Sequence, residues 1–288
     1  MYQFEIETPK NIMEALTLKN KFKNGIQPLA GGTDVLVMVR NKLGKWGASP
    51  RLLNLTQIQE LNFINDTDEF IEIGPLTTHT QVLESPIIKQ YFPAFVKAVA
   101  YVGSPQIRNL GTIIGNVCRA SPAADSLPIL YVRDAQVQIQ TIDDKKIIPI
   151  EEFITGPGQT VLPDNALVTK LIIPKLPNYI GDYTSIRQRI ALSIVVVSVA
   201  IEAQFNQEKR RLDDIRISLG AVSPTVVRAR KTENLLMTNI LNSDLIMEAK
   251  SRVKTECIPI TDVRSNKDYR QAMTSILLGR FLDNLIRS

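Results

Sequence analysis

The stretch that decides the fold is "QPLAGGTDVLVMVRNK", residues 27–42. An apolar approach leads into two adjacent glycines and a Thr-Asp pair, and an apolar-rich segment follows. This order is typical of a strand that turns tightly into a helix. Glycines let backbone N–H groups approach a phosphate closely, and a Thr hydroxyl and a helix start add donors. The stretch alone leaves an anion site and an empty turn equally open, because it matches neither the Walker A nor the G-x-G-x-x-G pattern.

A second glycine-bearing segment lies about eighty residues downstream, "GSPQIRNLGTIIGNVCRASPAADSLPIL", residues 103–130. Small and hydrogen-bonding residues crowd its middle, including Gly111, Thr112, Gly115, Asn116 and Asp125. Gly and Thr supply donors to phosphate, Asn bonds either way, and Asp accepts from ribose or ribityl hydroxyls. We therefore expect the two segments to clasp one dinucleotide-sized cofactor between two lobes.

Hydrophobic periodicity predicts short strands and helices in the first part of the chain. Strands are expected at 2–9, 25–29, 50–58, 68–74, 135–142, 145–153 and 166–174. Helices are expected at 11–22, after an Asn11 cap, and through 81–103 with breaks at Pro86 and Pro93. The glycine-bearing segment from Gly103 onward and "TGPGQT" (155–160) are expected as a loop and a turn.

Prolines and a glycine in "PKLPNYIGDY" (174–183) interrupt this pattern and indicate a boundary. Beyond it, long strands at 194–205 and 212–222 precede helices at 232–241, 245–256 and 268–286, which is an α+β arrangement. We expect one domain over 1–177, with lobes of about 1–57 and 58–177, and a second over 178–288.

Composition favours a globular protein, with 44% apolar residues in a chain of 288. The most apolar run, "ALSIVVVSVAIEAQF" (191–205), is too short and too β-branched to span a membrane and is expected to be a buried strand or a pair of strands. "MYQFEIETPK" has neither the basic nor the apolar region of a signal peptide, so a cytoplasmic protein is expected. The net charge of +5 is interleaved with acidic residues, as in "EKRRLDDIR", which favours a solvated face over nucleic-acid binding.

Cys118, Cys257 and His79 are the only cysteines and histidine. A structural zinc or an iron–sulfur cluster normally takes four such ligands, so we expect no metal site in this chain. Small buried thiols are favoured over a disulfide. His79, in "TTHTQV", is expected to cap or hydrogen-bond near a helix start and not to act as a catalytic base.

Four motifs carry a family resemblance in their order: "LAGGTD" (29–34), "GSPQIRNLGTIIGNVCRASPAADSLP" (103–128), "FITGPGQT" (153–160) and "KLIIP" (170–174). They resemble the FAD-binding subunit of molybdenum-containing hydroxylases of the xanthine, carbon monoxide and nicotinate dehydrogenase types, and the likeness covers nearly the whole chain. The resemblance implies an α+β fold: a two-lobed FAD-binding domain of the vanillyl-alcohol-oxidase (PCMH-like) type, followed by a smaller α+β C-terminal flavoprotein domain.

By motif, the resemblance assigns the pyrophosphate of FAD to Leu29, Ala30, Gly31, Gly32, Thr33 and Asp34. It assigns the second wall of the site to Gly111, Thr112, Gly115 and Asn116, with Asp125 toward the ribityl or ribose hydroxyls and Val168 against the flavin edge. Family members often carry Lys where this chain has Ser185, and two adjacent glycines where it has Ile114 and Gly115. No side chain is assigned a catalytic role.

Four further side chains stay open to two interpretations. Tyr101 and Tyr183 either flank the isoalloxazine or only pack in the core. Arg187 and Arg189 either meet a nicotinamide nucleotide or a partner subunit, or lie on an ordinary surface.

The function that the resemblance implies is electron transfer. A large molybdopterin-binding subunit would oxidise the substrate, a small subunit would carry two [2Fe–2S] clusters, and FAD in this chain would pass the electrons to NAD⁺ or another acceptor. The assembly would be a hetero-oligomer such as a dimer of heterotrimers. "TGPG" and the chain length favour a xanthine or purine dehydrogenase type over the carbon monoxide type.

Two alternatives remain. A free-standing flavin oxidase or reductase is disfavoured because the single His lies outside both segments and offers no covalent flavin link there. A cofactor-free scaffold is disfavoured because Gly31, Gly32, Gly111 and Gly115 are all present.

Overall fold

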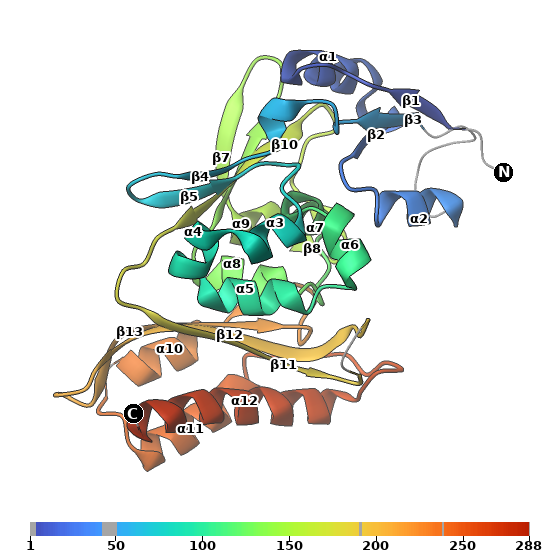
Figure 1. The fold of residues 1–288 in the computed structure, drawn as a ribbon. Coiled ribbons are helices and arrows are strands. Elements are labelled where there is room, and N and C mark those ends of the chain that lie inside the picture. Colours follow the sequence, from blue (N-terminus) through green and yellow to red (C-terminus); the bar gives the residue numbers. More distant parts are fainter. Residues whose placement is uncertain (1–3, 42–50, 190–191, 238, 288) are drawn as a thin grey trace.

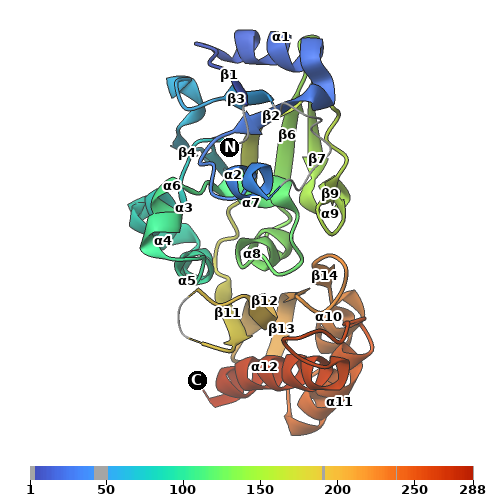
Figure 2. The same cartoon turned by 90° about the vertical axis from the view of Figure 1, so that its right-hand side faces the viewer.

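The computed structural model describes residues 4–41, 51–189, 192–237 and 239–287. Three layers are stacked in it, as Figure 1 and Figure 2 show: a first lobe built on a three-stranded sheet, a second lobe built on a five-stranded sheet, and a C-terminal domain built on a four-stranded sheet. Outside the described residues lie Lys42 of the opening stretch, Tyr2, Gln3 and Pro50 of the expected strands, Ala191 of the apolar run and Thr238 of the expected helix at 232–241.

The first lobe is a small parallel sheet in the order β1–β3–β2, formed by Glu5–Glu7, Arg51–Asn54 and Ile26–Leu29. Helix α1 (Ile12–Phe22) and the short η1 (Lys23–Gly25) connect β1 to β2; α1 begins after Asn11, whose side chain accepts from the Glu14 amide, as the sequence predicts. A turn after β2 leads into α2 (Val35–Arg40). The core of this lobe includes Leu16 and Ile26.

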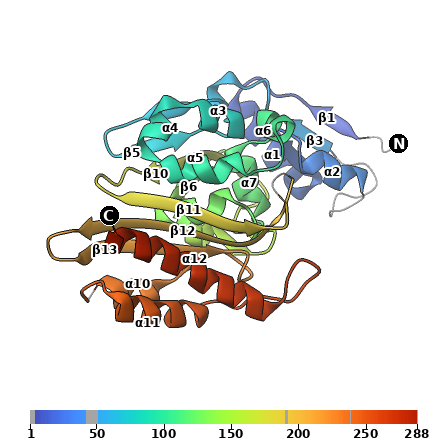
Figure 3. The same cartoon turned by 60° about the horizontal axis from the view of Figure 1, so that its bottom comes forward.

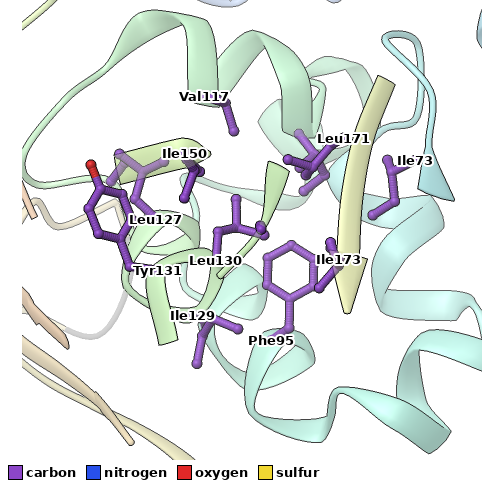
Figure 4. Packing of buried hydrophobic residues seen from close by; sticks show 14 of the residues in the cluster. Ile73, Phe95, Val117, Leu127, Ile129, Leu130, Tyr131, Ile150, Leu171 and Ile173 are labelled. Carbon is purple, nitrogen blue, oxygen red and sulfur yellow. The ribbon is translucent and has the colours of Figure 1, made fainter. Parts of the chain in front are cut away.

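The second lobe is an antiparallel sheet in the order β4–β5–β10–β6–β7. Its strands are Ile64–Asp66, Phe70–Ile73, Leu167–Pro174, Gln136–Gln140 and Lys145–Pro149. The other elements are η2 (Gln59–Leu61), α3 (His79–Glu84), α4 (Pro86–Tyr91), α5 (Pro93–Ala100), α6 (Pro105–Leu110), α7 (Ile113–Arg119), α8 (Ser126–Val132), α9 (Ile150–Phe153) and the hairpin of β8 (Ile154–Gly156) and β9 (Gln159–Thr160). Figure 4 shows Phe95, Leu130 and Ile173 packed together between the helices and the sheet.

Two expectations for the second lobe are wrong. The segment from Gly103 is not a loop but three short helices, α6 to α8, and Gly115 and Asn116 lie inside α7. Thr112 starts that helix, since its Oγ1 accepts from the Gly115 amide at 3.1 Å. The expected strand at 145–153 ends at Pro149 because the last four residues form α9. Pro86 and Pro93 do break the helical region, and each begins a new helix.

The C-terminal domain is an antiparallel sheet in the order β11–β12–β13–β14, formed by Ile180–Arg187, Val195–Asn206, Arg211–Gly220 and Val227–Arg228. Helices α10 (Arg230–Met237), α11 (Ser243–Lys254) and α12 (Lys267–Arg287) follow it. Figure 3 shows the sheet between α5 and α12, and α8 packs on the same face as α5. Because helices cover both faces, β12 is buried from Val195 through Ala203, which confirms the expected buried strand. No helix in the described ranges has the length and apolarity to cross a membrane.

Candidate functional site

The two glycine-bearing segments meet in the structure. A Cβ atom on Gly31 would lie 1.8 Å from the carbonyl oxygen of Leu110, so only glycine permits this backbone approach. On the other side of the contact, the hydroxyl oxygen of Thr33 lies 3.2 Å from the point that a Cβ on Gly111 would occupy. The β2–α2 turn and the α6–α7 junction therefore form one continuous surface.

The β2–α2 turn offers backbone donors. Gly32 has φ of 71°, a left-handed conformation that glycine adopts without strain. Residues 30–33 are half-buried and Asp34 is exposed. Among the described residues, no hydrogen bond takes the amide N–H of residues 31 to 34 as its donor. Consecutive free donors beside a helix start are the donor set that a phosphate needs.

An arginine that the sequence did not single out lies beside this turn. Nε of Arg119, the last residue of α7, forms an ion pair with Oδ2 of Asp34 at 2.6 Å, and both side chains are about half-exposed. The next residue, Ala120, accepts at its carbonyl from the Gly158 amide at 2.9 Å. The C-terminal end of α7 therefore contacts both the β2–α2 turn and the "TGPG" hairpin. No local signal marks Arg119, because its partner is distant along the chain.

The Thr-rich turn before α3 is hydrogen-bonded to the α6–α7 junction of the second glycine-bearing segment. Thr78 caps α3, and the backbone N–H of His79 donates to the Gly111 carbonyl at 2.9 Å. His79 is 3% exposed, and its Nδ1 has no hydrogen-bond partner among the described residues. Burial, followed by the nearby charge of Arg108, lowers the pKa of His79 to about 4. The imidazole is therefore neutral at neutral pH, and the capping role belongs to Thr78.

Helix α7 fixes the remaining residues of the second wall. Oδ1 of Asn116 accepts from the Ser126 hydroxyl at 2.6 Å, which ties α7 to the start of α8 beside Asp125. Val168, on β10, is 7% exposed and belongs to the same buried cluster as Val117 of α7. Val168 is therefore buried in the core of the second lobe.

Asp125 faces the C-terminal domain. Its Oδ1 accepts from the hydroxyl of Tyr183 at 2.5 Å and from Nη2 of Arg187. Nε of Arg187 donates to the Ser185 hydroxyl at 3.0 Å. Ser185 itself carries no charge, but the guanidinium lies against it, so the structure brings Asp125 and Ser185 together through Arg187.

The aromatic pair belongs to the same cluster. The guanidinium carbon of Arg187 lies 4.5 Å from the centre of the Tyr101 ring, and the rings of Tyr101 and Tyr183 are 6.4 Å apart. Burial and the neighbouring Asp125 raise the pKa of Tyr183 well above its usual range, so its hydroxyl stays a donor. Arg189 is exposed and donates to the Leu192 carbonyl at 2.6 Å.

These groups fit the chemistry of FAD. The turn at residues 31–34 offers amide donors, and Arg119 adds a positive charge beside it. Oδ2 of Asp125 takes part in no hydrogen bond among the described residues, which leaves one carboxylate oxygen for a sugar hydroxyl.

Comparison with known proteins also indicates that the chain binds FAD. The family described as the FAD binding domain in molybdopterin dehydrogenase matches residues 2–176, and the CO dehydrogenase flavoprotein C-terminal domain matches residues 183–285. The chain is 28% identical over 280 residues to the glyceraldehyde dehydrogenase medium chain of Sulfolobus acidocaldarius, covering 96% of this chain and 95% of that one. It is 27% identical to the xanthine dehydrogenase FAD-binding subunit of Escherichia coli O157:H7, over 87% of each chain.

The fold is also found in a solved structure. A chain of carbon monoxide dehydrogenase from Hydrogenophaga pseudoflava superposes with a TM-score of 0.90 at 24% identity, covering 96% of this chain and 95% of that one. This likeness confirms the expected α+β fold, and the match to the FAD-binding family confirms FAD as the cofactor. This chain belongs to the FAD-binding medium subunits of the molybdenum hydroxylases, and it is an oxidoreductase subunit.

Proposed function

We propose that this chain relays electrons, through the FAD that it binds, from [2Fe–2S] clusters of a small partner subunit to NAD⁺ or another acceptor. A large molybdopterin-binding subunit would oxidise the substrate, in an assembly such as a dimer of heterotrimers. Family membership supports the proposal, as do relatives named as medium chains and FAD-binding subunits. The observation that carries it is the contact of Gly31 with Leu110, which joins the two motif segments.

The proposed site uses backbone donors for the pyrophosphate and side chains for the sugar. Thr33 and Arg119 would add a hydroxyl and a positive charge to the amides at 31–34, with Leu29, Ala30 and Asp34 completing the turn. Gly111, Thr112, Gly115 and Asn116 would form the second wall, with Asp125 at a sugar hydroxyl and Val168 and Ser185 nearer the ring. Bound FAD supplies the redox chemistry of its isoalloxazine ring, and the chain supplies binding and orientation.

The domain division at 177/178 belongs to the same proposal. The polypeptide passes there from the sheet of the second lobe into β11, and Asp125 and Ser185 lie on opposite sides of that division. The site would therefore need both parts of the chain.

Flavin binding is the direct test of the site. Apoprotein is titrated with FAD while flavin fluorescence and visible absorption are followed. We expect equimolar, reversible binding, with the flavin released on denaturation. A folded apoprotein that leaves the flavin spectrum unchanged at saturating FAD would overturn the proposal, and flavin retained covalently would favour a free-standing oxidase.

The partners and substrate are tested on the native assembly. Affinity-tagged chain is purified from its source, and copurifying subunits are identified by mass spectrometry. We propose a xanthine or purine dehydrogenase type, which the "TGPG" hairpin and the similarity to the xanthine dehydrogenase subunit support. Xanthine is expected to reduce the flavin of the complex under anaerobic conditions. Reduction by glyceraldehyde or carbon monoxide, without reduction by xanthine, would reassign the substrate.

A further inference from the structure

Arg187 is held by three different groups. Its Nη2 pairs with Asp125 of the second lobe, its Nε donates to the Ser185 hydroxyl at 3.0 Å, and its Nη1 donates to the Ser193 carbonyl at 2.9 Å. The side chain is 7% exposed, and its guanidinium lies over the Tyr101 ring. A planar guanidinium bonded on three sides has one orientation, so Arg187 holds its partners in fixed positions.

The ionisation of the Asp125 carboxyl group is favoured by Arg187. Its side chain is 9% exposed, and the charged and titratable groups that face it are Arg187 and Tyr183, both from β11. Tyr101, which follows α5, faces the guanidinium. Burial raises the pKa of Asp125, while the charge and hydrogen bond of Arg187 and the hydroxyl of Tyr183 lower it. Without the guanidinium, the carboxyl group would keep its proton to higher pH.

The same contacts distinguish the two carboxylate oxygens of Asp125. Oδ1 accepts from both Tyr183 and Arg187, whereas Oδ2 has no hydrogen bond among the described residues. We propose that Arg187 is a positioning residue of the FAD site, which keeps Asp125 ionised and turned so that Oδ2 faces a sugar hydroxyl of the cofactor. The C-terminal domain thereby takes part in FAD binding through a residue that does not itself contact the sugar. This inference rests on the proposed FAD site.

The first test is the FAD affinity of Arg187→Gln as a function of pH, measured by flavin fluorescence. The wild-type affinity is expected to be nearly constant around neutral pH. The variant should bind FAD at least about tenfold more weakly, since Asp125 loses its charge-assisted contact with Arg187. Its affinity should also fall further as pH decreases, because the Asp125 carboxyl then becomes protonated. A loss of FAD affinity of the same size at every pH would overturn the inference, because a purely structural role of Arg187 would not depend on the protonation of Asp125.

The second test is a double-mutant cycle with Asp125→Asn. If Arg187 acts through Asp125, adding Arg187→Gln to Asp125→Asn should change the FAD affinity less than about twofold. If the two substitutions instead reduce the FAD affinity by independent factors that multiply in the double variant, the inference is overturned. Arg230→Gln is the matched control, because Arg230 and Glu151 form another ion pair between the domains, with 57% and 45% of their side chains exposed. That control should bind FAD like the wild type.

The two proposals fail separately. Wild-type protein that does not bind FAD refutes the proposed function. Wild-type protein that binds FAD, together with an Asp125→Asn variant of unchanged affinity, refutes only the positioning role. If Arg187→Gln does not fold, Arg187→Lys replaces it, since lysine keeps the positive charge but cannot donate in the fixed planar geometry that joins Asp125, Ser185 and Ser193. Arg187→Lys should weaken FAD binding several-fold, and unchanged affinity would overturn the positioning role.

Discussion

Asp125 and Arg187 form an ion pair buried between the two domains, with 9% and 7% of their side chains exposed. The pair joins the start of α8 in the second lobe to the end of β11 in the C-terminal domain. A buried carboxylate and a buried guanidinium stabilise each other only while both are present. The C-terminal domain is consequently part of the environment of the predicted FAD site.

Replacing Gly31 by Ala is expected to separate the two motif segments. The new Cβ would lie 1.8 Å from the Leu110 carbonyl oxygen, so the backbone must move. We expect a loss of about 1–3 kcal/mol in the free energy of unfolding, together with strongly weakened FAD binding. Thermal unfolding and FAD titration measure the two effects. Gly25→Ala is the control, because no atom lies within 4 Å of its added Cβ. Wild-type behaviour of Gly31→Ala would contradict the observed contact.

His79 predicts a pH dependence of stability. Its pKa is lowered to about 4 in the folded chain from 6.5, so between these values the unfolded chain binds more protons. Stability is therefore retained above about pH 6.5 and lost as pH falls toward 4. Wild-type protein should lose about 2 kcal/mol more than His79→Gln between pH 7 and pH 5 in denaturant titrations. His79 is the only histidine, so no other imidazole contributes. Equal losses in both proteins would refute this assignment.

Arg133 and Glu202 form a second buried ion pair between the domains, with 3% and 1% of their side chains exposed and Nη2 2.7 Å from Oε1. Arg133→Met would leave the Glu202 carboxylate buried without its cation. We expect a loss of about 3–5 kcal/mol in urea denaturation, and partial recovery when Glu202→Leu is added. Breaking the exposed pair of Arg252 and Glu248 should cost at most about 0.5 kcal/mol. A loss for Arg133→Met as small as that would argue against a buried pair.

Both thiols should react slowly in the folded chain. Burial raises the pKa of Cys118 to about 12 and is the main cause that raises the pKa of Cys257 to about 11. The thiolate is the reactive species, so its fraction is reduced about a thousandfold at Cys118 and about a hundredfold at Cys257. A thiol-specific chromogenic reagent should modify native protein far more slowly than protein in guanidinium chloride. Rapid modification of the native chain at Cys118, which is half-buried against the core, would contradict a raised thiol pKa at this position.

Local sequence predicted the elements whose cause is local. The Asn11 cap, the helix starts at Pro86 and Pro93, and the buried run at Val195 depend on residues a few positions apart. The expected loop after Gly103 was wrong for a related reason. The glycines of this segment indicated a loop, although Thr112 is also a good helix cap. Its hydroxyl accepts from the Gly115 amide and begins α7, because Ile113 and Val117 are buried in the core.

By itself, the sequence determined the order of the two motif segments and carried the family resemblance that implied FAD, because each motif is a short stretch of residues. Only the tertiary structure decided that Gly31 lies against Leu110, that Arg119 pairs with Asp34, and that Arg187 holds Asp125. These contacts join residues far apart along the chain. They depend on how β11 crosses α5 and α8 and how the β2–α2 turn meets α7, and no local pattern encodes which distant partner a side chain will meet.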